Sequence, residues 1–158
     1  MNSSAMTQYL TFDLLGEMYG VEILKVKEIR GWEEIRDIPN TPDYIKGALN
    51  LRGEIIPIVD LRVRFMMGEV TYTPITIIII LAVQTDTGET VIGIVADAVS
   101  DVLDISRDDI QEKPNLGSKI DMQFMLGLSV TADNMVMLLD VDKVLNPNYF
   151  EGLPSILS

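Results

Sequence analysis

The stretch NTPDYIKGALNLRGEIIPIVDLR, from Asn40 to Arg62, decides the fold of this chain. Its apolar residues predict two strands, Ala48–Leu51 and Glu54–Leu61, which meet at the turn pair Arg52-Gly53. Pro57 lies inside the second strand, where it cannot donate a hydrogen bond to a neighbouring strand, so it predicts a sheet edge or a bulge. The stretch contains no Cys, His or Ser, and therefore no strong nucleophile.

The segments on either side continue this pattern. QYLTFDLLGEMYGVEI alternates polar and apolar residues and predicts a hairpin that turns at Gly16. A short helix is predicted next, because Ile23, Val26 and Ile29 recur every third residue and a glycine follows them. Further along, ITIIIILAV (Ile75–Val83) has the Ile and Val content of a strand buried on both faces, and it is about half as long as a membrane span.

The chain also contains a faint internal repeat. YGVEILKVKEI, which begins at Tyr19, resembles IGIVADAVSDV from Ile92. GALNLRGEIIPIVDL from Gly47 aligns with GLSVTADNMVMLLDV from Gly127. Because both pairs occur in the same order and at nearly the same spacing, we infer two similar β-rich halves that pack against each other. TDTGE and TADN predict hairpin turns in the second half, and DVDKVLNP predicts one helical turn near its end.

Composition restricts the possible classes of function. The 158 residues carry a net charge of −12, and so acidic a surface repels nucleic-acid phosphates and anionic lipids. The lack of Cys excludes disulfides and thiolate metal sites, and the lack of His removes imidazole bases and histidine ligands. The first residues show no secretory signal, so the sequence favours a soluble, cytoplasmic protein.

One acidic region is the only candidate for acid–base or metal chemistry. It contains Asp97, Asp101, Asp104, Asp108 and Asp109. Paired carboxylates can hydrolyse glycosidic bonds, and acidic clusters can bind Ca²⁺. The spacing lacks the D-x-D-x-D-G pattern of a calcium loop, and aspartates beside SRDDI more often cap a helix or face solvent. We expect the capping or solvated role, with a Ca²⁺-dependent or carbohydrate-active protein as the alternative.

NLRGEIIPIVDLR, with YIKG before it and EILKVKEIRG upstream, resembles the hallmark of the CheW family of chemotaxis coupling proteins. The resemblance continues through GIVADAVSDVLDI and GLSVTADNMVMLLDVDKVL. It implies a mainly β fold of two five-stranded SH3-like β-barrels that share strands, with one or two short helices. We therefore expect a CheW-like domain over residues 7–147, with halves at roughly 7–65 and 73–147 that exchange strands. Residues 1–6 and 148–158 are expected to be flexible tails.

The resemblance also implies a function. CheW-like domains occur in the histidine kinase CheA and in CheV as well, but a chain of this length has no room for a kinase ATP lid or a receiver domain. The expectation is therefore a free-standing, non-enzymatic adaptor without cofactor, metal or catalytic residue. It would couple the cytoplasmic tip of methyl-accepting chemoreceptors to the regulatory domain of CheA, in membrane-associated arrays but without insertion into the membrane. The alternative is a CheW-like barrel of another receptor–kinase system, such as one for surface motility.

Candidate binding residues follow from the same resemblance. Val26 and Ile77 are implied to face the receptor tip, and Glu28, on the predicted helix, is implied to pair with Arg52 beside them. An exposed ion pair stabilises a fold by only about 0–1 kcal/mol, so orientation of the receptor-facing surface is the expected role. Ile35, an apolar residue among the charges of EEIRDIP, is the expected contact with CheA. Three residues are expected to be structural turn residues and not contacts: Gly47, Gly53 and Pro57.

Overall fold

A computed structural model of the chain describes residues 6–33, 35–111, 120–130 and 135–146. Its strands are β1 (Met6–Leu14), β2 (Glu17–Glu22), β3 (Val26–Gly31), β4 (Ile45–Leu51), β5 (Glu54–Val59), β6 (Ile77–Thr85), β7 (Gly88–Ala96), β8 (Ala98–Ser106), β9 (Ile110–Gln111), β10 (Met125–Val130) and β11 (Met135–Leu139). Its helices are the four-residue α1 (Leu61–Arg64) and α2 (Val141–Val144), with 3₁₀ turns η1 (Ile23–Lys25), η2 (Arg107–Asp109) and η3 (Met122–Phe124). None of the helices in these described ranges is long and apolar enough to cross a membrane.

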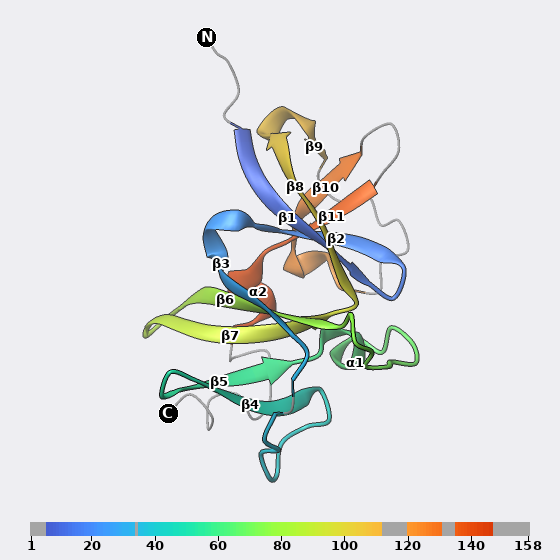
Figure 1. Cartoon of the computed structure of the whole chain (residues 1–158). Helices are drawn as coiled ribbons and strands as arrows, with labels where there is room; N and C mark the ends of the chain where they lie inside the picture. Colours follow the sequence, from blue (N-terminus) through green and yellow to red (C-terminus); the bar gives the residue numbers. More distant parts are fainter. Residues whose placement is uncertain (1–5, 34, 112–119, 131–134, 147–158) are drawn as a thin grey trace.

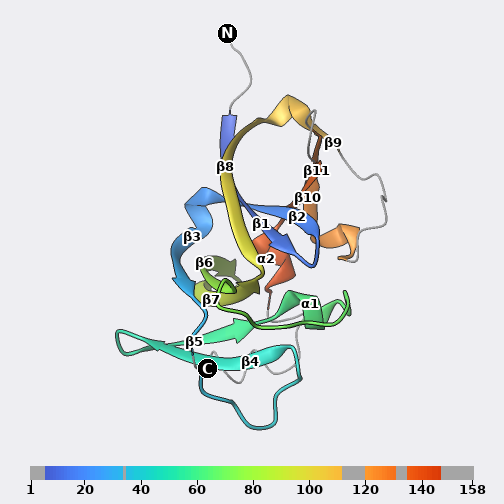
Figure 2. The same ribbon diagram turned by 45° about the vertical axis from the view of Figure 1, so that its right-hand side comes forward.

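The strands form two sheets. Sheet A has the order β8-β1-β2-β11-β10-β9, and sheet B has the order β3-β6-β7-β5-β4. Figures 1 and 2 show the two sheets one above the other, with α2 between them. This arrangement confirms the mainly β fold of two barrel-like subdomains with two short helices. Sheet A has six strands rather than five, because the two-residue β9 adds to β10.

Each sheet draws strands from both halves of the chain. Sheet A combines β1 and β2 with β8 to β11, while sheet B combines β3 to β5 with β6 and β7. When β1, β2, β3, β4 and β5 are matched with β6, β7, β8, β10 and β11, the two sheets have the same strand order. The chain therefore crosses from one sheet to the other twice, once at η1 between β2 and β3 and once between β7 and β8.

The core lies in three places, and β6 explains why. Ile79 and Leu81 point into a shared core between the sheets, which also contains Phe12 and Leu14 of sheet A. Ile78 and Ile80 point to the other face of β6, into a core inside sheet B. A smaller core inside sheet A contains Tyr9, Ile105, Val136 and Leu138. The isoleucine run is thus a strand buried on both faces, as the sequence predicts.

The predicted helix around Val26 and Glu28 is wrong. Only η1 is helical there, and Val26 begins the extended strand β3. The register against β6 shifts between Val26 and Glu28, so Lys27 forms a bulge. The extra residue places Val26 and Ile29 on one face although they are three apart, which imitates a helical period. Both are β-branched, which favours a strand.

The hairpins fall where the sequence predicts them, with differences at the ends. β5 ends at Val59, and the predicted strand runs too far because Asp60 caps α1. Pro57 predicts an edge or a bulge. β5 is an inner strand, so the edge is not found, but the paired strand β4 has a bulge between Ile45 and Gly47, beside the residue opposite Pro57. The amide and carbonyl of Ala48, opposite Pro57, bond outward to Arg36, so the Pro57 nitrogen points towards β7. Pairing with β7 begins only at Ile58, so the lack of an N–H group at Pro57 leaves no hydrogen bond to β7 unmade.

The turn at TDTGE and the helical turn near Val141 are also confirmed. Met6, which the sequence assigns to a tail, is the first residue of β1. Residues 1–5, the TADN turn and residues 147–158 lie outside the described residues.

Candidate functional site

The turn between β4 and β5 presents Arg52 from a rigid support. Arg52 (φ 53°) and Gly53 (φ 87°) both have positive φ, and Leu51 pairs with Glu54, which is the type I′ turn favoured in two-residue hairpins. Asn50 Oδ1 accepts a hydrogen bond from Gly53 N at 3.0 Å. The Arg52 side chain is 78% exposed. A long cation therefore projects into solvent from a fixed point.

Glu28 on β3 joins this cation to a small ionic network. Its Oε1 lies 3.5 Å from Arg52 Nη2, so the ion pair implied by the resemblance is present. Its Oε2 is closer to another arginine, at 2.8 Å from Arg30 Nη1, and Arg30 also contacts Glu33 at 2.9 Å. Hydrogen bonds to Glu28 and Glu33 raise the pKa of Arg30. Arg30, which sequence analysis missed, therefore fixes the carboxylate that receives Arg52.

An apolar strip runs along the same edge of sheet B. Val26 lies opposite Leu81 and Ile29 lies opposite Ile79, so both share the face of the sheet that enters the shared core. Ile77, opposite Gly31, lies on that face too. Val26 and Ile77 are half-buried, whereas Ile29 is 44% exposed. We call Val26, Ile29 and Ile77 the β3 strip; Ile29 was missed because the sequence placed it on a helix.

The β3 strip and the ion pair point to opposite faces of one edge strand. Glu28 lies opposite Ile80, whose side chain enters the core of sheet B, whereas the strip shares the face of Ile79. In the described chain β3 pairs only with β6. A partner that covers the free edge of β3 can therefore contact apolar side chains on one side and the charges on the other.

Ile35 lies in the connection between β3 and β4. It is half-buried and packs against the sheet B core beside Trp32 and Tyr72, which stack at 4.5 Å. A groove of about 830 Å³ opens nearby, and the 59%-exposed Ile55 lies on its wall. Its lining residues are Glu33, Arg36, Asp37, Ile38, Pro39, Asn40, Thr41, Ala48, Leu49, Asn50 and Ile55. Ile35 is not among them, so the structure does not bring it into the groove.

Of the three predicted turn residues, only Gly53 lies in a turn, because Gly47 and Pro57 lie inside β4 and β5. Gly47 has φ 145° at a bulge in β4, and a Cβ there would collide with the carbonyl oxygen of Arg36. Gly53 supplies the second positive φ of the Arg52 turn, with open space around it. Neither position can present a side chain to a partner.

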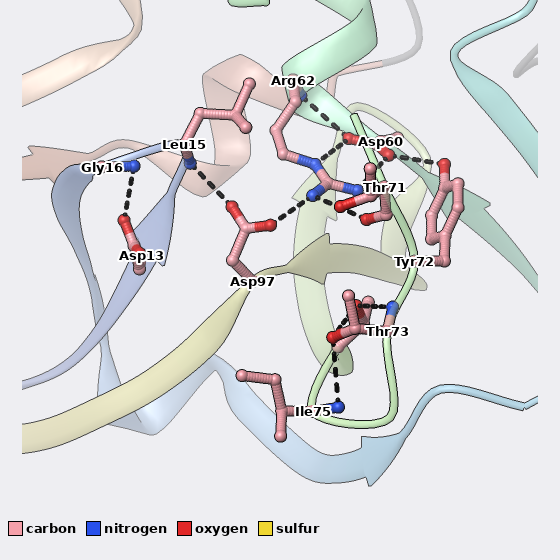
Figure 3. A network of polar contacts seen from close by, with 11 residues as sticks. Asp13, Leu15, Gly16, Asp60, Arg62, Thr71, Tyr72, Thr73, Ile75 and Asp97 are labelled. Atoms are coloured by element: carbon pink, nitrogen blue, oxygen red, sulfur yellow. Dashed lines mark hydrogen bonds and ion pairs between the residues drawn. The ribbon is translucent and has the colours of Figure 1, made fainter. Parts of the chain in front are cut away.

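A buried polar network around Arg62 was not foreseen from the sequence (Figure 3). Arg62 and Asp60 are fully buried, and the Arg62 Nε and Nη2 atoms donate to the two Asp60 oxygens at 2.9 and 2.8 Å. Tyr72 Oη donates to Asp60 at 2.7 Å, and Arg62 also pairs with Asp97. Burial alone would lower the pKa of Arg62, but Asp60 and Asp97 outweigh it and the pKa is raised. Burial, and then Asp60, raise the pKa of Tyr72.

Asp97 is therefore not the capping or solvated residue that we expect from the sequence. Its Oδ2 accepts a hydrogen bond from Leu15 N at 2.7 Å, and its other oxygen pairs with Arg62. The other four aspartates of the region are exposed, and Ser106 rather than an aspartate caps η2. Within the described ranges, no group of three or more acidic side chains is placed to hold a metal ion. The carboxylates at Asp97–Asp109 thus form no common site.

Comparison with known proteins agrees with this architecture. The family model described as CheW-like domain matches residues 8–148. A chemotaxis protein CheW from Klebsiella aerogenes is 42% identical over 88% of this chain and 81% of its own length. One from Rhizobium meliloti is 34% identical over 87% of this chain and 86% of its own. The crystal structure of the scaffolding protein TtCheW from Thermoanaerobacter tengcongensis superposes with a TM-score of 0.75, at 33% identity over 87% of this chain and 86% of that one. The chain belongs to the CheW-like domain family.

Proposed function

We propose that this chain is a non-enzymatic adaptor of a chemotaxis system, which couples methyl-accepting chemoreceptors to the histidine kinase CheA. The observation that carries the proposal is the edge of β3, where one exposed and two half-buried apolar side chains occur beside an exposed cation within a CheW-like domain. An adaptor of this kind acts by contacts alone, and its site is cytoplasmic, at membrane-associated receptor arrays.

The receptor-facing surface in this proposal is the β3 strip together with Glu28 and Arg52. A helical hairpin needs a few apolar anchors with polar groups around them, and the strip with its ionic neighbours has that composition. Because the Arg52–Glu28 distance is 3.5 Å and Arg52 is 78% exposed, the cation is free to turn towards an acidic group of the receptor. If Arg52 turns away from Glu28 towards the receptor, Arg30 still pairs with Glu28.

The contact with CheA is proposed at Ile35 and the adjoining groove. Ile35 is half-buried, and the groove is lined by the exposed Ile55 and the half-buried Ile38 between charged residues. An apolar side chain of a second barrel can enter such a groove while the rim charges pair around it. The two surfaces adjoin at the β4–β5 turn, because the groove residues Asn50 and Ile55 flank Arg52 and Gly53. Each partner would have its own apolar contact, Ile29 for the receptor and Ile55 for CheA.

Reconstitution tests the proposal directly. Receptor fragments and CheA are mixed with and without this chain, and autophosphorylation of CheA is measured. We expect the chain to make kinase activity depend on the receptor. Arg52→Glu is expected to remove that dependence while its unfolding midpoint stays that of the wild type. Arg107→Glu serves as the matched control, because Arg107 is an exposed cation in η2, between β8 and β9. Kinase activity that is the same with and without the chain would refute coupling.

A further inference from the structure

Two ionic clasps occupy equivalent places in the two halves of the chain. In the first clasp, Leu15 N at the end of β1 donates to Asp97 at 2.7 Å, and Asp97 pairs with Arg62 of α1 (Figure 3). In the second, Gln84 N near the end of β6 donates to Asp142 of α2 at 2.8 Å, and Asp142 pairs with Lys25 of η1 at 2.8 Å. Each clasp consists of one amide, one carboxylate and one cation.

The carboxylate and the cation have exchanged places between the clasps. Arg62 and Asp142 both lie two residues after the aspartate that caps their helix. Asp97 and Lys25 both lie in the segments where the chain crosses between the sheets, just before β8 and β3. The first clasp therefore has its cation on the helix and its carboxylate in the crossover, and the second has the reverse.

Both clasps join the two sheets at a crossover. The first connects β1 of sheet A with α1, which follows β5 of sheet B. The second connects β6 of sheet B with α2, which follows β11 of sheet A. Because the crossover residue is a member of each clasp, the clasp fixes where the crossing strand starts.

The two clasps differ in their exposure. Arg62 is fully buried, whereas the Lys25 and Asp142 side chains are 29% and 34% exposed. Water and salt therefore weaken the second clasp more than the first. Lys25 directly precedes Val26, the first residue of the β3 strip.

We propose that Lys25 and Asp142 are positioning residues, which hold the start of β3 against α2 and thereby set the β3 strip relative to sheet A for its partner. This inference rests on the proposed function for the identity of that partner, a receptor tip. Neither residue needs to contact the receptor. Their effect on binding is transmitted through the place at which β3 leaves the crossover.

The test uses the exchange of charges that the chain already contains. Lys25→Asp and Asp142→Lys each place like charges together, and the double variant places a carboxylate in the crossover and a cation on the helix, as in the first clasp. If Lys25→Asp unfolds the chain, Lys25→Met is used in its place, because it removes the charge and keeps an apolar side chain. Lys27→Asp is the matched control, because its partner Glu89 is 3.9 Å away and both residues lie in sheet B.

Two measurements follow each variant. The chain has no cysteine, so Gln8→Cys on sheet A and Glu54→Cys on sheet B, both exposed, give a unique pair of spin labels whose distance reports the placement of the sheets. Affinity for a receptor-tip fragment is measured alongside, and unfolding midpoints confirm that each variant is folded. We expect both single variants to shift or broaden the distance and to lose receptor affinity by roughly fivefold or more, while the double variant recovers both. Lys27→Asp is expected to leave the distance unchanged.

The inference is overturned if both single variants keep the wild-type distance, or if the double variant recovers nothing. A changed distance with wild-type receptor affinity overturns the positioning role. A wild-type chain that binds no receptor fragment overturns the proposed function and this role with it, and in that case the distances alone decide whether the clasp places the sheets.

Discussion

Gly20 and Gly93 occupy matching positions in the two sheets. Gly20 of β2 lies beside Leu138 in the parallel pairing of β2 with β11, and Gly93 of β7 lies beside Ile58 in the parallel pairing of β7 with β5. Side chains of the neighbouring strands fill the space above each glycine. In each sheet, a glycine therefore lies where a strand from one half of the chain pairs in parallel with a strand from the other half.

Gly93→Ala is expected to destabilise the fold. A Cβ at Gly93 would lie 2.6 Å from Ile58 Cδ1 and 3.0 Å from Ile78 Cγ2, so the sheet B core must shift. Overpacking of this kind costs about 1–3 kcal/mol in free energy of unfolding, measured by urea denaturation. Gly20→Ala, where the nearest atom is 3.0 Å away, is expected to cost less.

A second substitution checks the cause. Ile58→Val removes Cδ1, the atom nearest to the added methyl group. The double variant Gly93→Ala with Ile58→Val is therefore expected to be more stable than the sum of the two single effects. Additive losses would show that the clash with Ile58 is not the reason.

Gly47→Ala is expected to cost more than any substitution in the Arg52 turn. The position combines φ 145° with a collision between the new methyl group and the backbone oxygen of Arg36, which a rotamer change cannot relieve. A loss of roughly 2–4 kcal/mol in free energy of unfolding is expected. In Gly53→Ala the added methyl group meets no other atom, and only the positive φ of 87° is unfavourable for alanine. The expected loss in free energy of unfolding is therefore about 1–2 kcal/mol. Equal losses would contradict this account.

The sequence predicted those parts of the fold that depend on neighbours in the chain. Alternation predicted the first hairpin, and the continuous run of Ile and Val predicted the buried β6, because both patterns can be read from neighbouring residues. The helix predicted at Val26 is wrong because the bulge at Lys27 changes the spacing of the buried side chains from two residues to three, which is the spacing of a helix. A bulge depends on the partner strand, which no window of sequence contains.

The candidate site shows the same limit. Arg52 and Gly53 could be selected because turns restrict residue types, and the Glu28–Arg52 pair followed only from resemblance to a family. The Arg62–Asp97 pair joins residues 35 positions apart, and the Lys25–Asp142 pair joins residues 117 apart. Such pairs follow from the strand exchange, and charges alone do not identify them among many alternatives.

Replacement of Arg62 by Met is expected to be one of the most damaging changes in the chain. It leaves the fully buried Asp60 carboxylate without its cation, which costs about 3–5 kcal/mol in free energy of unfolding. Asp60→Asn in the same chain removes the buried charge and can still cap α1, so part of the loss is expected to return. Thermal and urea unfolding of the two variants measure this, and equal stability of the single and double variants would refute the explanation.

The raised pKa of Tyr72 leads us to expect that the folded chain loses stability at alkaline pH. The ordinary pKa of Tyr72 is 10.0, and burial together with Asp60 raises the pKa in the folded chain. The unfolded chain therefore releases this proton at a lower pH than the folded chain does, so the stabilisation is complete below about pH 10 and is lost as the pH rises above it.

Urea midpoints between about pH 8 and pH 11 test this effect. Tyr72→Phe is expected to lower stability at pH 8 by about 1–3 kcal/mol, through loss of the hydrogen bond to Asp60, and to flatten the alkaline decline. The pKa of Tyr9 is raised by burial and by Glu22, so Tyr9→Phe is the comparison. An alkaline decline as steep in Tyr72→Phe as in the wild type would show that Tyr72 is not its source.

Ile29 and Ile55 separate the two proposed contacts. Ile29 (44% exposed) belongs to the β3 strip and Ile55 (59% exposed) to the groove near Ile35, and surface substitutions of this kind change stability by only about 0.5 kcal/mol. Ile29→Asp is expected to weaken binding of a receptor-tip fragment by roughly tenfold or more and to leave binding of the CheA regulatory domain unchanged. Ile55→Asp is expected to do the reverse.

Met66→Asp, at an 86%-exposed residue after α1, is the control and is expected to change neither receptor binding nor CheA binding. If each isoleucine variant weakened both contacts equally, the receptor and the kinase would share one surface, and two separate apolar contacts would not explain coupling.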